Sequence, residues 1–114
     1  MKLSDLEKKV LFTIADNHAD GRIIKAQVAQ AKVDQRDYTG VGFRTYFTVD
    51  TVRRHLNKAL WKTKDMPKAY GEHPDLSAGA SFVLLLADGF ISCLEGQTNG
   101  EDWPRDEAKF KIKA

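Results

Sequence analysis

Three side chains of this sequence could form an acid–base set, namely Glu95, His73 and Tyr46. Glu95 ends the largely apolar run of residues 81–94, and a carboxyl group that is removed from water acquires the raised pKa that a general acid requires. The alternative is that Glu95 lies at a strand end, where it reaches water or pairs with a cation such as Arg44. A small enzyme with Glu95 as acid or base is one hypothesis, and it requires these side chains to converge in one cleft.

The sequence lacks the residue patterns of several other common catalytic and metal sites. The three histidines, His18, His55 and His73, stand at no metal-ligand spacing with one another or with the single cysteine, and one cysteine builds neither a zinc site nor an internal disulfide. Cys93 lies in an apolar run, which favours a buried, unreactive thiol, and residues 72–75 are typical of a solvated loop. The sequence has no glycine-rich phosphate loop and no Gly-x-Ser-x-Gly motif. We therefore expect a protein that is not an enzyme and holds no metal or cofactor.

A block of positive charge at residues 50–68 could bind nucleic acid. Six basic residues stand there against two acidic ones, a local charge of +4, with a tryptophan among them. Lysine and arginine neutralise phosphates, and an aromatic ring stacks on bases. The candidate contacts are Arg53, Arg54, Lys58, Trp61 and Lys62. The alternative is a solvated helix face with the tryptophan tucked into the core.

A block of negative charge at residues 95–107 could bind another protein. Five acidic residues stand there against one arginine, a local charge of −4, and a Trp-Pro pair lies among them. Tryptophan is enriched at the centres of protein interfaces, and opposed charge steers partners together. The candidate partner-binding residues are Glu101, Asp102, Trp103, Asp106 and Glu107. The alternative is that the tryptophan packs on the sheet and tethers the loop.

The bulk properties describe a small globular protein. With 114 residues the chain has the size of a single domain, 1–114, and its apolar fraction of 42% is ordinary. The net charge of +2 by itself argues for neither nucleic acid nor membrane. The N-terminus has no apolar run of signal-peptide length, and the longest uncharged apolar run, 78–87, is too short to span a bilayer. We expect a cytoplasmic protein with no membrane association.

Residues 81–96 carry the strongest structural signal. Two apolar runs meet at Asp88-Gly89, which is the residue pair preferred in two-residue hairpin turns. Counting outward from this turn places Ala87 opposite Phe90, and continues without interruption until Phe82 stands opposite Glu95. The first strand is apolar on both sides, which predicts a central strand covered on both faces.

Helical and strand patterns assign most of the remaining chain. Ser4 to Glu7 forms a capping box, and apolar residues at helical spacing follow until about residues 17–21. Residues 22–37 fit either a helix or a strand, and we favour a strand that ends near Tyr38. Residues 43–49 alternate cleanly as a strand. A second, basic helix is expected from Asp50 or Thr51 to about residue 66, where Pro67 stops it.

The last third of the chain adds a loop and an edge strand to this prediction. Residues 67–78 are polar and contain two prolines, so we expect an irregular connection. Residues 107–114 alternate apolar residues with lysines, which is typical of an exposed edge strand. The predicted fold class is therefore α+β, with an N-terminal helix and a second basic helix packed on a mainly antiparallel sheet of about four or five strands.

Four segments together resemble a family of small, uncharacterised bacterial proteins. They are GVGFRTYF at 40–47, GASF at 79–82, DGFISCLEGQT at 88–98 and WP at 103–104. Their counterparts in the family are a Gly-x-Gly-Phe-x-Thr-x-Phe motif, then Asp-Gly-x-Ile-x-x-Leu-Glu-Gly-x-Thr and a closing Trp-Pro. The resemblance covers residues 37–104, with the charged stretch 50–68 as an insertion. It implies a small α+β protein and an immunity-like role beside bacterial toxins, as a neutralising partner, and it carries no catalytic residue across.

The preferred function is therefore non-enzymatic binding of another protein, in the manner of an immunity protein that blocks a bacterial toxin. Nucleic-acid binding through residues 50–68 ranks second, and a small enzyme built around Glu95 ranks third.

Overall fold

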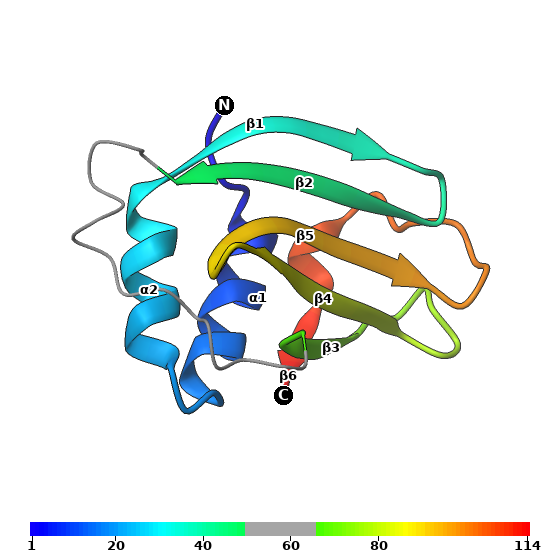
Figure 1. Cartoon of the computed structure of the whole chain (residues 1–114). Helices are drawn as coiled ribbons and strands as arrows, with labels where there is room; N and C mark the ends of the chain where they lie inside the picture. The colour runs from blue at the N-terminus through cyan, green and yellow to red at the C-terminus, as the bar shows by residue number, and fades with distance from the viewer. Residues whose placement is uncertain (50–65) are drawn as a thin grey trace.

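Among the residues that the structure describes, six antiparallel strands form one sheet, and two helices pack on it (Figure 1). The computed structural model describes residues 1–49 and 66–114. The strand order across the sheet is β1-β2-β5-β4-β3-β6. The helices are α1 (Asp5–Asp16) and α2 (Gly21–Gln30), and the short 3-10 helix η2 spans Glu107–Lys109. The strands are β1 (Ala31–Tyr38), β2 (Gly42–Val49), β3 (Lys68–Glu72), β4 (Ala80–Ala87), β5 (Phe90–Thr98) and β6 (Lys111–Lys113).

This architecture confirms the predicted α+β class, with six strands in place of four or five. The extra strand is β3, which lies in the stretch expected to be an irregular connection. Its inward residues, Ala69 and Gly71, are small, so the alternation of buried and exposed positions is weak in the sequence. Pairing with β4 on one side and β6 on the other supplies the hydrogen bonds that hold it. The predicted basic helix lies almost wholly outside the described residues.

The start of α1 follows the predicted capping box. The Glu7 backbone N–H donates to Ser4 Oγ at 3.1 Å, and the Ser4 N–H donates to Glu7 Oε1 at 2.7 Å. These bonds satisfy two of the backbone donors that a helix N-terminus leaves free. The helix ends at Asp16, as expected, and places Val10, Leu11 and Ile14 in the core.

Residues 21–38 form a helix followed by a strand, which are the two structures that the sequence pattern allowed. The favoured strand is wrong for residues 21–30, which form α2 and bury Ile24, Gln27 and Val28 at helical spacing. It is right for residues 31–38, which form β1 and end at Tyr38. The change of period falls at Ala31, a residue that fits both patterns. Packing of α2 against α1, β5 and β2 favours the helical state, because tertiary contacts override weak local preference.

The β4–β5 hairpin turns at Asp88-Gly89 as predicted, but its register changes after two pairs. Both turn residues have positive φ, 54° and 80°, which is the geometry that Asp-Gly favours. Leu86 pairs with Ile91, and the next pair joins Leu85 to Cys93, so a bulge leaves Ser92 unmatched. The predicted pairing of Phe82 with Glu95 is therefore wrong by one residue. Glu95 stands opposite Val83, and Phe82 stands opposite Gly96.

A buried glutamine of α2 binds the hairpin beside the bulge. Gln27 of α2 is fully buried, and its Nε2 donates to the Gly89 carbonyl at 3.1 Å while its Oε1 accepts from the Ile91 N–H at 2.9 Å. The side-chain amide of Gln27 thus donates to and accepts from the hairpin backbone, as the backbone of a neighbouring strand would. It satisfies one buried backbone carbonyl and one buried backbone N–H of the hairpin, close to the unmatched Ser92.

The position of β4 confirms the predicted central strand, but its two faces differ in burial. Phe82 and Leu84 face the helices and are fully buried. Val83 and Leu85 point to the opposite side, which we call the outer face, and are half-buried. The expectation of cover on both faces is therefore only partly met.

The C-terminal strand confirms the predicted edge. β6 is the last strand of the sheet, and Lys111 and Lys113 are exposed on it. The predicted strand is shorter than expected because residues 107–109 form η2, which begins where Asp106 Oδ1 accepts from the Ala108 N–H at 3.2 Å. Phe110 then enters the core.

One ion pair ties α1 to the sheet from inside. The Glu7 side chain is 1% exposed and accepts from Arg36 Nε of β1 at 2.9 Å and from the Thr45 hydroxyl of β2. Burial acts to raise the pKa of Glu7, but the hydrogen bonds from Arg36, Thr45 and Ser4 outweigh it and hold the pKa below its ordinary value of 4.5. The folded state therefore favours the ionised carboxylate.

This network predicts acid-sensitive stability. Because the folded-state pKa of Glu7 is depressed, its contribution is present above the unfolded value near 4.5 and is lost as the pH falls through the folded pKa. We expect the melting temperature to drop more between about pH 5 and about pH 3 in the wild type than in Glu7→Gln, which cannot titrate. Thermal melts followed by circular dichroism test this, and parallel pH profiles for the two proteins would contradict it.

Candidate functional site

The three side chains of the proposed acid–base set do not converge. Glu95 and Tyr46 lie on the outer face, where Arg44 Nε approaches Glu95 Oε2 at 3.6 Å. His73 is fully buried and packs edge-on against Phe110 in the core, with ring centroids 4.8 Å apart. The alternative in which Glu95 pairs with Arg44 is the arrangement observed. Glu95 therefore lies beside Arg44 on the neighbouring strand, and His73 lies in the core away from it.

His73 is a structural residue, and the expectation of a solvated loop is wrong at this position. Its Nδ1 accepts from the Asp75 N–H at 3.0 Å, so Nε2 carries the proton and donates to the Asp106 carbonyl at 2.8 Å. The ring therefore links the loop after β3 to the loop before η2. Both ring nitrogens are occupied by backbone groups, which leaves none for a substrate.

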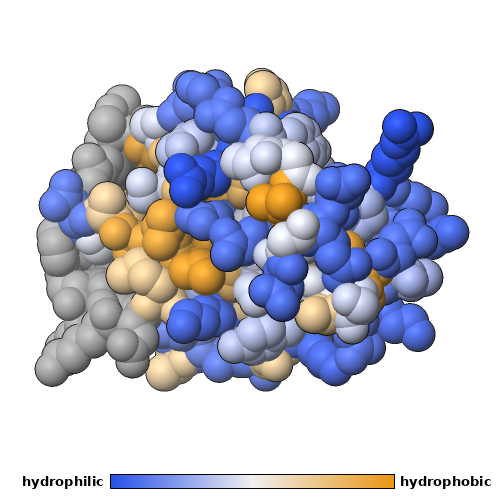
Figure 2. Space-filling model, turned by 90° about the vertical axis from the view of Figure 1, so that its right-hand side faces the viewer, coloured by the Kyte–Doolittle hydropathy of each residue, from blue (hydrophilic) through white to orange (hydrophobic). Residues whose placement is uncertain are grey.

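The acidic residues gather at one end of the sheet, which we call the loop end. The β1–β2 turn at 39–41, the β3–β4 loop at 73–79 and the acidic loop at 99–107 meet there, opposite the Asp88-Gly89 turn (Figure 1). Figure 2 looks at this end and shows hydrophilic side chains over much of it, with one larger apolar patch left of centre and smaller ones elsewhere. Two backbone bonds of 2.8 Å fasten the loops, from the Thr98 N–H to the Val41 carbonyl and from the Trp103 N–H to the Gly40 carbonyl.

Trp103 anchors the acidic loop to the core. Its ring lies 5.3 Å from Phe43, 6.1 Å from Phe82 and 5.1 Å from Phe110, measured between centroids. Its indole N–H donates to Glu107 Oε2 at 2.8 Å. The side chain is half-buried, so the tethering alternative describes its main contacts. Only its exposed edge is available to a partner.

The acidic side chains differ in their contacts with the rest of the protein. Glu101 Oε1 accepts from the Ser77 N–H and hydroxyl at 2.9 and 2.7 Å, which lowers the pKa of Glu101. Glu107 is held by Trp103. Asp102 is exposed, and no described residue forms an ion pair with it. Asp106 is also exposed, with Oδ1 capping η2. The loop thus presents carboxylates from a fixed backbone.

Two apolar side chains that sequence reasoning missed extend this surface. Tyr38 is 60% exposed and Val41 is 37% exposed, at the end of β1 and in the turn that follows it. Partial burial and then the Glu107 carboxylate raise the pKa of Tyr38. The sequence pattern assigns Tyr38 to a strand and Val41 to a turn, and it does not predict that either side chain is exposed. Their exposure depends on where the acidic loop packs, so no local signal could have found them.

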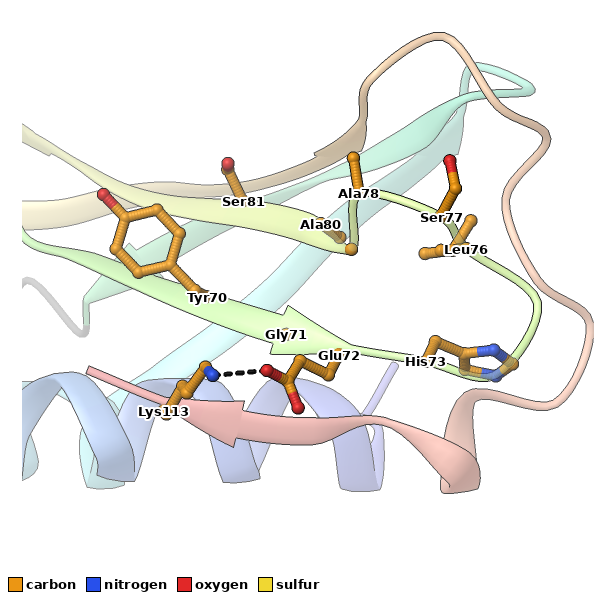
Figure 3. A pocket seen from close by; sticks show the side chains of 11 residues that line it. Tyr70, Gly71, Glu72, His73, Leu76, Ser77, Ala78, Ala80, Ser81 and Lys113 are labelled. Carbon is orange, nitrogen blue, oxygen red and sulfur yellow. Dashed lines mark hydrogen bonds and ion pairs between the residues drawn. The ribbon is translucent and has the colours of Figure 1, made fainter.

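A hollow of about 600 Å³ lies beside the acidic loop, between β3, the β3–β4 loop, the start of β4 and β6 (Figure 3). Gly79, at φ +67°, shapes its wall, since a Cβ there would lie 2.4 Å from the Gly71 carbonyl oxygen. Ser77 connects the hollow to the acidic loop through Glu101. The residues that line it on the strands are Tyr70, Gly71, Glu72, Ala80, Ser81 and Lys113.

Other sequence candidates fall outside this region. The proposed nucleic-acid contacts, Arg53, Arg54, Lys58, Trp61 and Lys62, lie outside the described residues. Cys93 is buried as predicted, and burial raises the pKa of its thiol. Within residues 1–49 and 66–114, no His, Cys, Asp or Glu side chains cluster in the way that a metal ion requires. In the same residues, no helix has the length and apolar character needed to cross a membrane.

Comparison of the chain with protein-family models, with curated proteins and with solved structures gives no significant match.

Proposed function

We propose that this chain is a non-enzymatic protein-binding domain that binds a basic surface of its partner at the loop end. The observation that carries the proposal is the rigid presentation of the acidic loop. Trp103 packs on three core rings, and its backbone N–H bonds to the β1–β2 turn, so the loop is ordered before binding. A partner that binds a preorganised loop does not have to offset the entropy of ordering it.

The chemistry of the surface supports a basic partner. Asp102 and Asp106 are exposed carboxylates, and Tyr38 and Val41 add exposed apolar area beside them. Charged groups that surround an aromatic side chain are the usual composition of a protein interface, with opposed charge setting orientation and association rate. The family resemblance of residues 37–104 supplies the narrower proposal, that the partner is a bacterial toxin which this protein neutralises.

Charge reversal tests this proposal. We expect Asp102→Lys/Asp106→Lys to weaken partner binding at least about tenfold, because two attractive contacts become repulsive. Trp103 is left intact, since its removal would disturb the core. The immobilised protein is incubated with a lysate of its native host, retained proteins are identified, and the affinity of the purified partner is measured by calorimetry at two salt concentrations.

Asp16→Lys is the matched control. Asp16 is an exposed aspartate at the C-terminal end of α1, where it forms a surface ion pair with Lys25, and this end of the helix is remote from the loop end (Figure 1). A partner held equally by the wild type, the control and the double variant would refute the acidic loop as the contact site. Coexpression with the captured protein then tests neutralisation, and growth that is not restored would remove the toxin role.

A further inference from the structure

Among the described residues, the hollow beside the acidic loop is lined by one acidic and one basic side chain, so its net charge is close to zero. Its charged lining residues in the described part of the chain are Glu72 and Lys113, and these two side chains form an ion pair across β3 and β6 (Figure 3). His73 also contributes to the wall, but its ring is buried in the core with both nitrogens bonded. An ionic ligand would therefore have to compete with an existing pair.

Hydroxyl groups supply the remaining polar chemistry. Tyr70 and Ser81 are directly opposed on β3 and β4, and both side chains lie on the outer face at the hollow. No described residue hydrogen-bonds to either hydroxyl. Ser77 donates its hydroxyl hydrogen to Glu101, which leaves its oxygen able to accept. Each of these groups can therefore bond to a ligand without losing a hydrogen bond to another described residue.

The Tyr70 ring adds an apolar platform among these polar groups. It is 47% exposed, although its neighbours across the strands are the polar residues Lys113 and Ser81. An aromatic ring offers a flat apolar face together with a polar tip. Sugars match this combination, because one face of a pyranose ring carries C–H groups while its rim carries hydroxyls.

The lining discriminates between classes of ligand. A purely apolar ligand would strip water from Glu72, Lys113 and the hydroxyls without replacing their hydrogen bonds, which is costly. A neutral polyhydroxylated ligand can donate to the Glu72 carboxylate and accept from the Lys113 ammonium while their pair persists. We propose that this hollow binds a neutral saccharide, with the Tyr70 ring against its C–H face and Ser81, Glu72 and Lys113 around its hydroxyl groups.

Titration of the isotopically labelled protein with glucose, galactose, mannose and N-acetylglucosamine tests this inference by amide chemical shifts. We expect at least one sugar to cause saturable shifts confined to residues 70–72, 77–81 and 113. Tyr70→Ala should weaken that sugar at least about tenfold, since about 1.4 kcal/mol of ring contact corresponds to that factor. Ser81→Val, which removes the hydroxyl and keeps a residue suited to a strand, should weaken it comparably.

Phe12→Ala is the matched control, because Phe12 is an aromatic residue of similar exposure, 44%, on α1. It should leave the sugar affinity unchanged, and so should Asp102→Lys/Asp106→Lys, which separates this site from the acidic loop. Absence of saturable shifts with all four sugars, shifts elsewhere, or equal affinity in folded Tyr70→Ala and Ser81→Val would overturn the proposal. Saturation of the same amides by inorganic phosphate or acetate alone would assign an ionic ligand and overturn it as well.

Discussion

Replacement of Glu7 by leucine should lower the free energy of unfolding by about 4 kcal/mol, because it breaks a buried ion pair from one side. The carboxylate is 1% exposed and accepts hydrogen bonds from Arg36, Thr45 and Ser4. Leucine is similar in size but accepts none of them. The Arg36 guanidinium, itself 17% exposed, would be left without its counter-charge. Urea denaturation at neutral pH measures the loss.

Glu72→Leu provides the control for this prediction. Glu72 also pairs with one cation, Lys113, but its side chain is 62% exposed. Water screens such a pair and solvates whichever group remains, so the denaturation midpoint should change little. If both substitutions shifted the midpoint by similar amounts, burial of the Glu7 network would not be the source of its stability.

Replacement of Gln27 by leucine should cost about 3 kcal/mol of unfolding free energy, even though it places an apolar side chain in the core. Gln27 bonds to the Gly89 carbonyl and to the Ile91 N–H, and all three groups are shielded by α2 and the hairpin. Leucine would leave two buried backbone groups unpaired, at about 1–3 kcal/mol each. Because these groups flank the hairpin turn, hydrogen exchange at residues 89–91 should also accelerate.

Gln97→Leu tests the same chemical change without the buried bonds. Gln97 lies on β5 in an exposed position of the outer face. Its replacement should change the unfolding free energy by no more than about 0.5 kcal/mol, as is usual for surface substitutions. Equal destabilisation by the two substitutions would show that the loss of a glutamine in itself, and not the two backbone bonds, is responsible.

Local signals in the sequence were sufficient wherever neighbouring residues complete the structure. The Ser4–Glu7 capping box, the Asp88-Gly89 turn and the edge position of residues 111–113 all appear as predicted. In each case the decisive bonds or dihedral angles belong to residues a few positions apart. The charge blocks were also evident, since they depend on composition alone.

Features that depend on distant residues were not predictable. The register of the hairpin departs from simple counting at Ser92, next to Ile91, whose N–H donates to Gln27 more than sixty residues away. The helix at residues 21–30 packs against α1, β5 and β2, and the ambiguous pattern of that segment does not encode these contacts. His73 was expected in solvent and lies in the core, because the loop before η2 folds over it.

The candidate site shows the same division. Composition by itself determined that residues 95–107 are acidic and contain a tryptophan. Only the tertiary structure decided that Trp103 faces Phe43, Phe82 and Phe110, that Tyr38 and Val41 stand exposed beside the acidic loop, and that a neutral hollow adjoins it. The physical reason is that charge belongs to individual residues, whereas burial and proximity arise from contacts between strands that are far apart in the chain.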